Sequence, residues 1–170
     1  SMIAHHGEKK AEIWARGLVN NLARRPQGND RAQVKAIYEG QCDLAIINNY
    51  YFGKLKYSED EKQRDWVKKL NLIFPNQEIS DRGAHINISG GGVALHSKNK
   101  EAAIALLEFL TEKDSQILYG EINFEYPVNP DVAPTDELQR WGSFREDSLP
   151  IQRIAELSRN AQMIVDRVGW

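Results

Sequence analysis

Short apolar runs that end in turn residues alternate with helix-like stretches, and this alternation restricts the fold more than any other feature. The clearest run is Cys42–Ile47, which is bounded by turn signals and has the pattern of a strand buried on both faces. Similar runs cover Leu72–Phe74, Ala84–Ile88 and Gly92–His96. Strands that alternate with helices indicate an α/β fold with a mostly parallel sheet.

Apolar residues spaced three or four apart predict the helices between these runs. The predicted helices cover about Glu8–Arg24, Asp30–Glu39, Ser58–Leu70, Lys100–Leu110 and Asp114–Tyr119, and a final long helix has Pro150 in its first turn. Asn29 or Asp30 can cap the second of them, and Gly40 can end it.

The composition excludes several classes of protein. Hydrophobic residues make up 41% and charged residues 27% of the chain, as in an ordinary soluble globular protein. The 22 basic and 24 acidic residues are interspersed and give a net charge of -2, so no basic block marks a nucleic-acid or membrane-surface partner. Cys42 is the only cysteine, which excludes an internal disulfide and a CxxC metal site. No apolar run approaches the roughly 18 residues of a membrane span.

The most informative polar stretch is Asn48-Asn49-Tyr50-Tyr51, which follows the run Cys42–Ile47. Ligands of parallel sheets bind beyond the carboxyl ends of strands, where this stretch is expected. Adjacent tyrosines on a continuing strand face opposite sides, whereas a loop or a helix start can turn both toward one cleft. Phenolate oxygens are hard anionic donors, suited to Fe(III) rather than to softer metals. Binding must displace the phenol protons, so the affinity should fall in acid.

The side-chain amides of the neighbouring asparagines have two possible roles. Asn48 and Asn49 can donate to an anion that completes an iron shell, or they can cap the following helix. Asn29 is likewise a helix cap or an anion anchor, and both roles are compatible because helix starts favour anions. Ser89–Gly92 lacks the Lys-Ser/Thr ending of a phosphate loop and reads as a bend between strands. No acid–base pair or hydrolase triad is visible, so an enzyme is not predicted.

At the tyrosine pair the sequence resembles the periplasmic ferric-ion-binding proteins, the iron receptors of ABC importers. The pair is specific to this iron subgroup. Further segments resemble the wider receptor family, namely 4–8, 28–30, 40–45, 83–93, 98–110 and 126–129. The resemblance implies a type II two-lobed, hinged fold that closes on Fe(III), with Tyr50 and Tyr51 as ligands. Asn48 and Asn29 match positions that support a bound synergistic anion.

The resemblance also implies how the chain is organised. Residues 1–80 belong to the C-terminal lobe and carry the tyrosine pair, 81–131 contain a hinge crossing and a segment of the N-terminal lobe, and 132–170 return to the C-terminal lobe. Family members are about twice as long, with their other iron ligands in an N-terminal half. We therefore expect a piece of a longer precursor that holds iron weakly by itself. Its unpaired strand edges invite oligomers or exchanged elements.

The implied partners are the membrane permease of the importer and the missing N-terminal half, and the implied location is the periplasm. Two alternatives remain open. The same receptor fold can take a non-metal ligand, such as a small anion or a thiamine-like cation, on its tyrosines. The lobe fold can also serve an α/β enzyme or the effector domain of a transcription regulator, because a fold does not settle a function.

Overall fold

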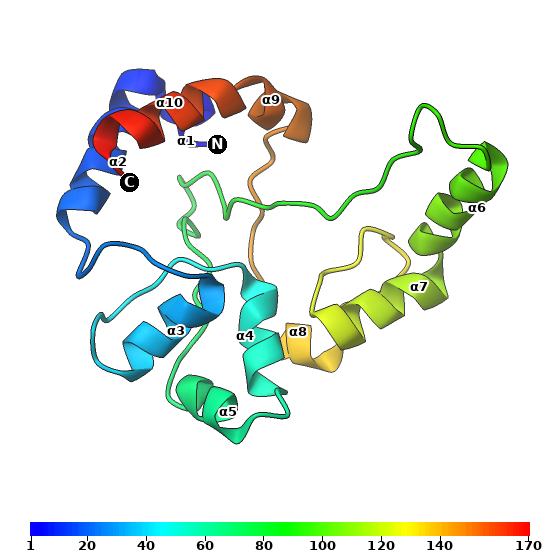
Figure 1. Cartoon of the computed structure of the whole chain (residues 1–170), viewed down its shortest axis with the longest axis horizontal. Helices are drawn as coiled ribbons and strands as arrows, with labels where there is room; N and C mark the ends of the chain where they lie inside the picture. The colour runs from blue at the N-terminus through cyan, green and yellow to red at the C-terminus, as the bar shows by residue number, and fades with distance from the viewer. The chain divides into compact units, whose positions relative to one another are not determined.

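The structure is a computed structural model that describes residues 1–170, and the chain divides into two compact units. The first unit contains residues 1–45, 73–87 and 144–170, and the second contains 46–72 and 88–143. Figure 1 shows both as helices joined by long connections. Neither unit is one continuous stretch of sequence, so each depends on contacts between distant segments.

The first unit contains α1 (Met2–His6), α2 (Glu8–Asn20), α3 (Asp30–Tyr38), α9 (Ile151–Glu156) and α10 (Ser158–Val168). Its core joins α2 to α10. Ala11 and Ala15 of α2 are buried against Ile164 and Val168 of α10, and each pair is spaced four residues apart, on one helix face. The predicted final helix is wrong in one respect, because it is interrupted at Leu157.

A buried carboxylate, Asp147, fastens α1 to the segment that leads into α9. It is 3% exposed and accepts hydrogen bonds from Ser1 Oγ (2.6 Å), His5 Nε2 (2.9 Å) and the Leu149 amide (3.1 Å). Burial by itself would raise the pKa of Asp147, but these hydrogen bonds outweigh it and hold the pKa at about 2. The ionised form is therefore the one that stabilises the folded unit.

We expect this carboxylate to make the fold acid-sensitive. Because the pKa of Asp147 is lower in the folded chain, its contribution is complete above the ordinary value of 3.8 and is lost as the pH falls toward about 2. The loss should be on the order of 2 kcal/mol. Urea unfolding at pH 5 and near pH 2.5 measures the change in the free energy of unfolding between these pH values. Asp147→Asn should make this change smaller. Equal acid sensitivity in Asp147→Asn and in the exposed control Asp43→Asn would contradict the assignment.

The second unit contains α4 (Asn49–Lys56), α5 (Glu61–Val67), α6 (Lys100–Thr111), α7 (Lys113–Leu118), the π-helix η1 (Tyr119–Asn123) and α8 (Asp136–Arg140). Its buried apolar residues are Leu55, Val67, Phe124, Val132 and Leu138. The predictions of helices near 100–110 and 114–119 are confirmed. None of the helices in either unit has the length and apolarity needed to cross a membrane.

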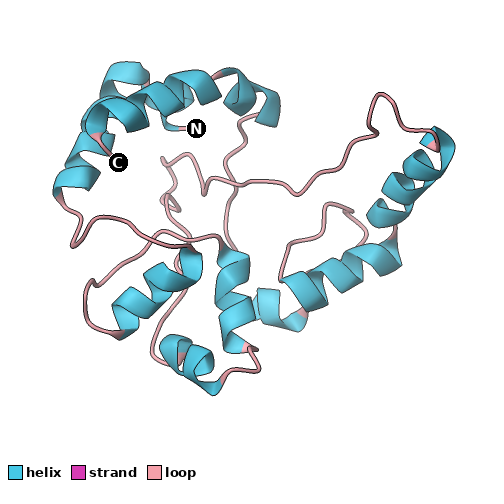
Figure 2. Cartoon of the chain, in the orientation of Figure 1, coloured by secondary structure: helices cyan, strands magenta, loops and turns pink.

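The predicted parallel sheet is not confirmed. Figure 2 shows helices and loops without strands, and the isolated β-bridge is a parallel one between Ala84 and Glu146. The predicted strands run instead as irregular segments with exposed large apolar side chains, which are Leu44, Ile46, Ile73, Ile88 and Leu95. A strand exists only where a neighbouring segment completes its hydrogen bonds. These segments have a strand's composition, but their pairing is limited to the bridge at Ala84 and does not extend to a ladder.

Candidate metal site

Tyr50 and Tyr51 lie in the first turn of α4, and their rings are neighbours. Asn48 stands at the helix N-cap with an extended backbone (φ -74°, ψ 133°), and the helix begins at Asn49. The two ring centroids are 4.4 Å apart, with the ring planes tilted by 35°, and both residues are partly buried. The tyrosines therefore lie at a helix start and not on a continuing strand, and a helix start can bring adjacent tyrosines together. Their role as ligands stays a prediction.

A cation lies over the first of these rings. Lys54 Nζ is 5.2 Å from the centroid of the Tyr50 ring, one helical turn further along α4. Contacts of this kind contribute about 0.5–1 kcal/mol at exposed sites, so Lys54 helps to hold the Tyr50 ring in place. The four-residue spacing is visible in the sequence, although our sequence analysis did not single out Lys54.

Helix α4 also makes a close contact with an aromatic ring. Gly53 is buried, and a Cβ atom built on it would lie 2.3 Å from Cγ of Phe124. Phe124 has a left-handed backbone (φ 57°) at the end of η1. Its ring stacks on Tyr57, with centroids 5.4 Å apart and planes 13° apart. This contact fixes the rotation of α4, and with it the side on which the tyrosines emerge.

The end of α4 is fastened by a buried carboxylate on α8. Glu137 is 7% exposed. Its oxygens accept hydrogen bonds from Lys56 Nζ (2.6 Å), Tyr57 Oη (2.7 Å) and Trp141 Nε1 (2.9 Å). Burial by itself would raise the pKa of Glu137, but these donors outweigh it and lower that pKa. Tyr57 gives its hydroxyl hydrogen to this network, and the carboxylate raises the pKa of Tyr57.

The two predicted anion positions have different surroundings. Asn29 lies in the first unit, where its Oδ1 accepts the Ala32 amide (3.2 Å) and caps α3. Its capping role is therefore confirmed. Asn48 is exposed at the start of α4 and makes no capping hydrogen bond with its side chain. The anion-binding role of both residues stays a prediction.

Other metal donors do not gather elsewhere in the chain. No group of three or more His, Cys, Asp or Glu side chains is arranged to hold a metal ion. The rings of Tyr50 and Tyr51 are neighbours, with centroids 4.4 Å apart. Phenolate oxygens in general are hard donors that suit hard cations better than thiolate or imidazole ligands do.

Comparisons with known proteins point to one class of protein. Residues 8–146 match the family described as bacterial extracellular solute-binding protein. Iron uptake proteins A2 and A1 of Synechocystis sp. are 41% and 37% identical over all 170 residues. The major ferric iron-binding protein of Neisseria meningitidis is 27% identical over 163 residues. The chain spans about half the length of the curated relatives it matches, 49%, 47% and 46% respectively.

Solved structures of iron-binding proteins are also similar to this chain. The ferric binding protein from Campylobacter jejuni superposes with a TM-score of 0.94 at 40% identity, over 99% of this chain and 53% of that one. A Trichodesmium protein solved with iron and citrate superposes with a TM-score of 0.92 at 43% identity, over 100% and 53%. The backbone of this chain is thus similar to about half of each of these proteins.

Proposed function

Because the chain belongs to the family of bacterial extracellular solute-binding proteins, we propose that it is part of a receptor that binds ferric iron through Tyr50 and Tyr51. The observation that carries the proposal is the pair of phenol rings, with centroids 4.4 Å apart, at the start of α4. Relatives named for iron uptake or ferric iron binding support iron as the cargo. Neighbouring phenols are hard donors that suit Fe(III).

The chemistry is that of capture and release rather than catalysis. Two phenolates balance two of the three positive charges of Fe(III), and both protons leave when the metal binds. Protonation in acid, or reduction to Fe(II), weakens the attraction and frees the iron. Binding and release of iron by a receptor need no enzymatic step.

The rest of the iron shell is proposed to come from two sources. An anion can balance the remaining charge, with Asn48, next to the tyrosine pair in the sequence, as a donor, and the citrate in the Trichodesmium structure supports a carboxylate. The anion-binding role of Asn29 stays a separate prediction. Further ligands would come from the half of the receptor that this sequence does not span. The same half would complete the two-lobed type II fold and its parallel sheet, with 1–80 and 132–170 in one lobe and 81–131 crossing to the other.

The family supports a proposed partner and location. We propose that the whole receptor collects iron in the periplasm and delivers it to the membrane permease of an ABC importer. The family description as extracellular supports a site outside the cytoplasmic membrane.

Adding Fe(III) as a citrate chelate to the whole receptor tests the proposal. Phenolate bound to iron should give a visible charge-transfer band, and the band should fade as the pH is lowered or the iron is reduced. A receptor for a non-metal ligand would show no band at any pH. Absence of the band at neutral pH, with iron supplied in excess, would overturn the assignment of Tyr50 and Tyr51.

A further inference from the structure

Lys54 is the lysine of α4 that has no acidic partner. The helix runs over Asn49–Lys56 without an aspartate or a glutamate, so its own residues cannot neutralise its lysines. Lys56 is neutralised from α8, because its Nζ lies 2.6 Å from Oε1 of Glu137. None of the ion pairs of the chain involves Lys54. One uncompensated positive charge therefore remains on the helix that carries the tyrosines.

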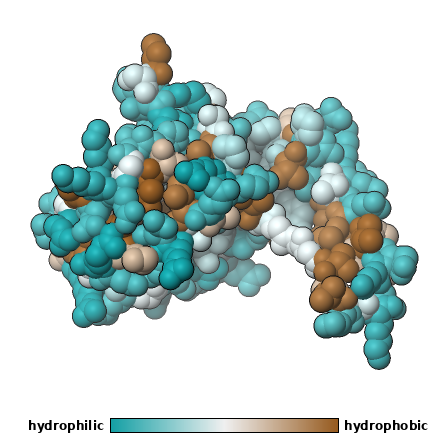
Figure 3. All heavy atoms as spheres, turned by 90° about the horizontal axis from the view of Figure 1, so that it is seen from above, coloured by the Kyte–Doolittle hydropathy of each residue, from teal (hydrophilic) through white to brown (hydrophobic).

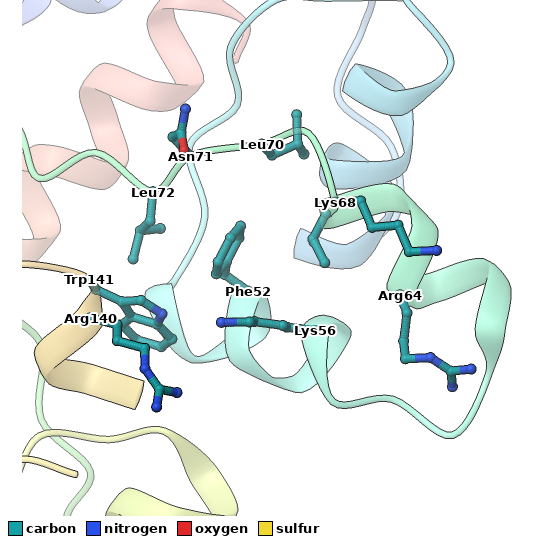
Figure 4. A pocket seen from close by; sticks show the side chains of 10 residues that line it. Phe52, Lys56, Arg64, Lys68, Leu70, Asn71, Leu72, Arg140 and Trp141 are labelled. Carbon is teal, nitrogen blue, oxygen red and sulfur yellow. The ribbon is translucent and has the colours of Figure 1, made fainter. Parts of the chain in front are cut away.

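The two lysines of α4 lie on different faces of the helix. Lys56 shares its face with Phe52, four residues before it, and Figure 4 shows both beside Trp141 in the wall of an open hollow. Lys54 does not line this hollow. It shares its face with Tyr50, four residues before it, and its Nζ lies 5.2 Å from the centroid of the Tyr50 ring. The uncompensated charge of α4 is thus on the side of the proposed iron ligand.

Partial burial distinguishes Lys54 from an ordinary surface lysine. Hydrophilic residues cover much of the surface that is visible in Figure 3, and Lys69 of the same unit is an exposed example. Lys54 is partly buried, beside a tyrosine ring that is also partly buried. Charges in partly buried sites are screened less by water and salt than exposed charges are. Lys54 can therefore attract an anion near Tyr50 more strongly than an exposed lysine would.

The charges on this side of the iron site favour a ligand with more than one negative charge. Fe(III) and the phenolates proposed for Tyr50 and Tyr51 sum to a single positive charge, and Lys54 adds another. A monocarboxylate that binds the metal leaves no charge for Lys54, whereas a polycarboxylate can bind iron with one group and present another to the lysine. The ammonium carries its donors on a flexible stem, so it can follow a carboxylate that the metal does not fix.

We propose that Lys54 selects the anion that accompanies the iron, and that the preferred class is a polycarboxylate with one carboxylate free of the metal. The inference rests on the proposed function of Tyr50 and Tyr51. Asn48 cannot supply this selection, because its amide carries no net charge. Hydrogen bonds to charged groups are stronger than neutral ones, so the ammonium decides between ligands that differ in charge.

Succinate and its monomethyl ester test the proposal, because they share a carbon chain and differ by one negative charge. Each is titrated into the whole receptor after iron has been loaded in hydrogen carbonate buffer, and the shift of the phenolate-to-iron band measures binding. The unchanged receptor should bind succinate at least about tenfold more tightly than the ester, as expected for a charge-assisted contact. Lys54→Met should lower this ratio about fivefold or more, and Lys54→Arg should retain it, because Arg keeps the charge.

The matched control is Lys69→Met, which removes the same charge from an exposed lysine of the same unit and should leave the ratio unchanged. If Lys54 only held the Tyr50 ring in place, Lys54→Met would weaken the binding of both ligands equally. Such an equal loss, or equal binding of the two ligands to the unchanged receptor, would overturn the proposal. A receptor without the iron band would overturn the iron proposal and this inference together, whereas a band with an unchanged ratio in Lys54→Met would overturn this inference alone.

Discussion

Replacing Tyr50 and Tyr51 together by Phe is expected to remove the visible iron band and to lower the ferric-iron affinity of the receptor by more than about 100-fold, the largest effect usual for an outer-shell partner. The change deletes two oxygens and little else. The rings, with centroids 4.4 Å apart, can keep their contact, so the loss reports on coordination. Titration against a competing chelator measures the affinity, and absorbance measures the band.

A third tyrosine provides the matched control. Tyr57 follows the last residue of α4, and its hydroxyl donates to Glu137 at 2.7 Å. Tyr57→Phe should retain the band and bind iron with nearly unchanged affinity. A band that survives the double change at Tyr50 and Tyr51, or one that disappears in Tyr57→Phe alone, would show that the ligand pair is misassigned. The chain by itself should bind iron much more weakly than the whole receptor.

The second large effect is expected at Gly53, where Ala should destabilise the chain although Ala is the better helix former. The added Cβ would lie 2.3 Å from Cγ and 2.7 Å from Cδ1 of Phe124, closer than atoms approach. The ring has little room to move, because it is buried and stacked on Tyr57. Overpacking typically costs about 1–3 kcal/mol, which exceeds the roughly 1 kcal/mol that Ala gains over Gly in a helix. Gly53→Val should cost more.

Denaturant unfolding measures both variants, and Gly17 supplies the control. Gly17 lies within α2, and a Cβ built there meets nothing within 4 Å, so Gly17→Ala should stabilise by up to about 1 kcal/mol. Adding Phe124→Leu to Gly53→Ala should recover part of the loss if the ring causes it. Equal stability of Gly53→Ala and Gly17→Ala would mean that the close contact does not fix α4.

Local features of this fold were predictable because their signals lie within a few residues. Asn29 caps a helix that starts at Asp30, as a polar residue before an amphipathic stretch predicts. The helix Lys100–Thr111 follows from its apolar spacing. Boundaries were less predictable, since the helix expected over 58–70 is confined to Glu61–Val67. Short helices end where packing no longer supports them.

Contacts between distant residues were not predictable in the same way. Glu137 meets Lys56 at 2.6 Å although 81 positions separate them, and Gly53 meets a ring 71 positions away, since 124 − 53 = 71. No short-range pattern marks such pairs. The predicted strands are not confirmed for a related reason, because a strand forms only with a neighbour and the pairing of these segments is limited to the bridge between Ala84 and Glu146.

By itself, the sequence determined the local helices, the position of the tyrosine pair after an apolar run, and the resemblance that made ferric iron the leading hypothesis. Only the tertiary structure decided that the two phenols lie side by side at a helix start, and that Phe124 and Glu137 hold that helix. It also decided that the strand-like segments form no ladder beyond the bridge at Ala84. The physical reason is that helix hydrogen bonds close within four residues, whereas the contacts of strands and of buried charges must be made by distant parts of a chain.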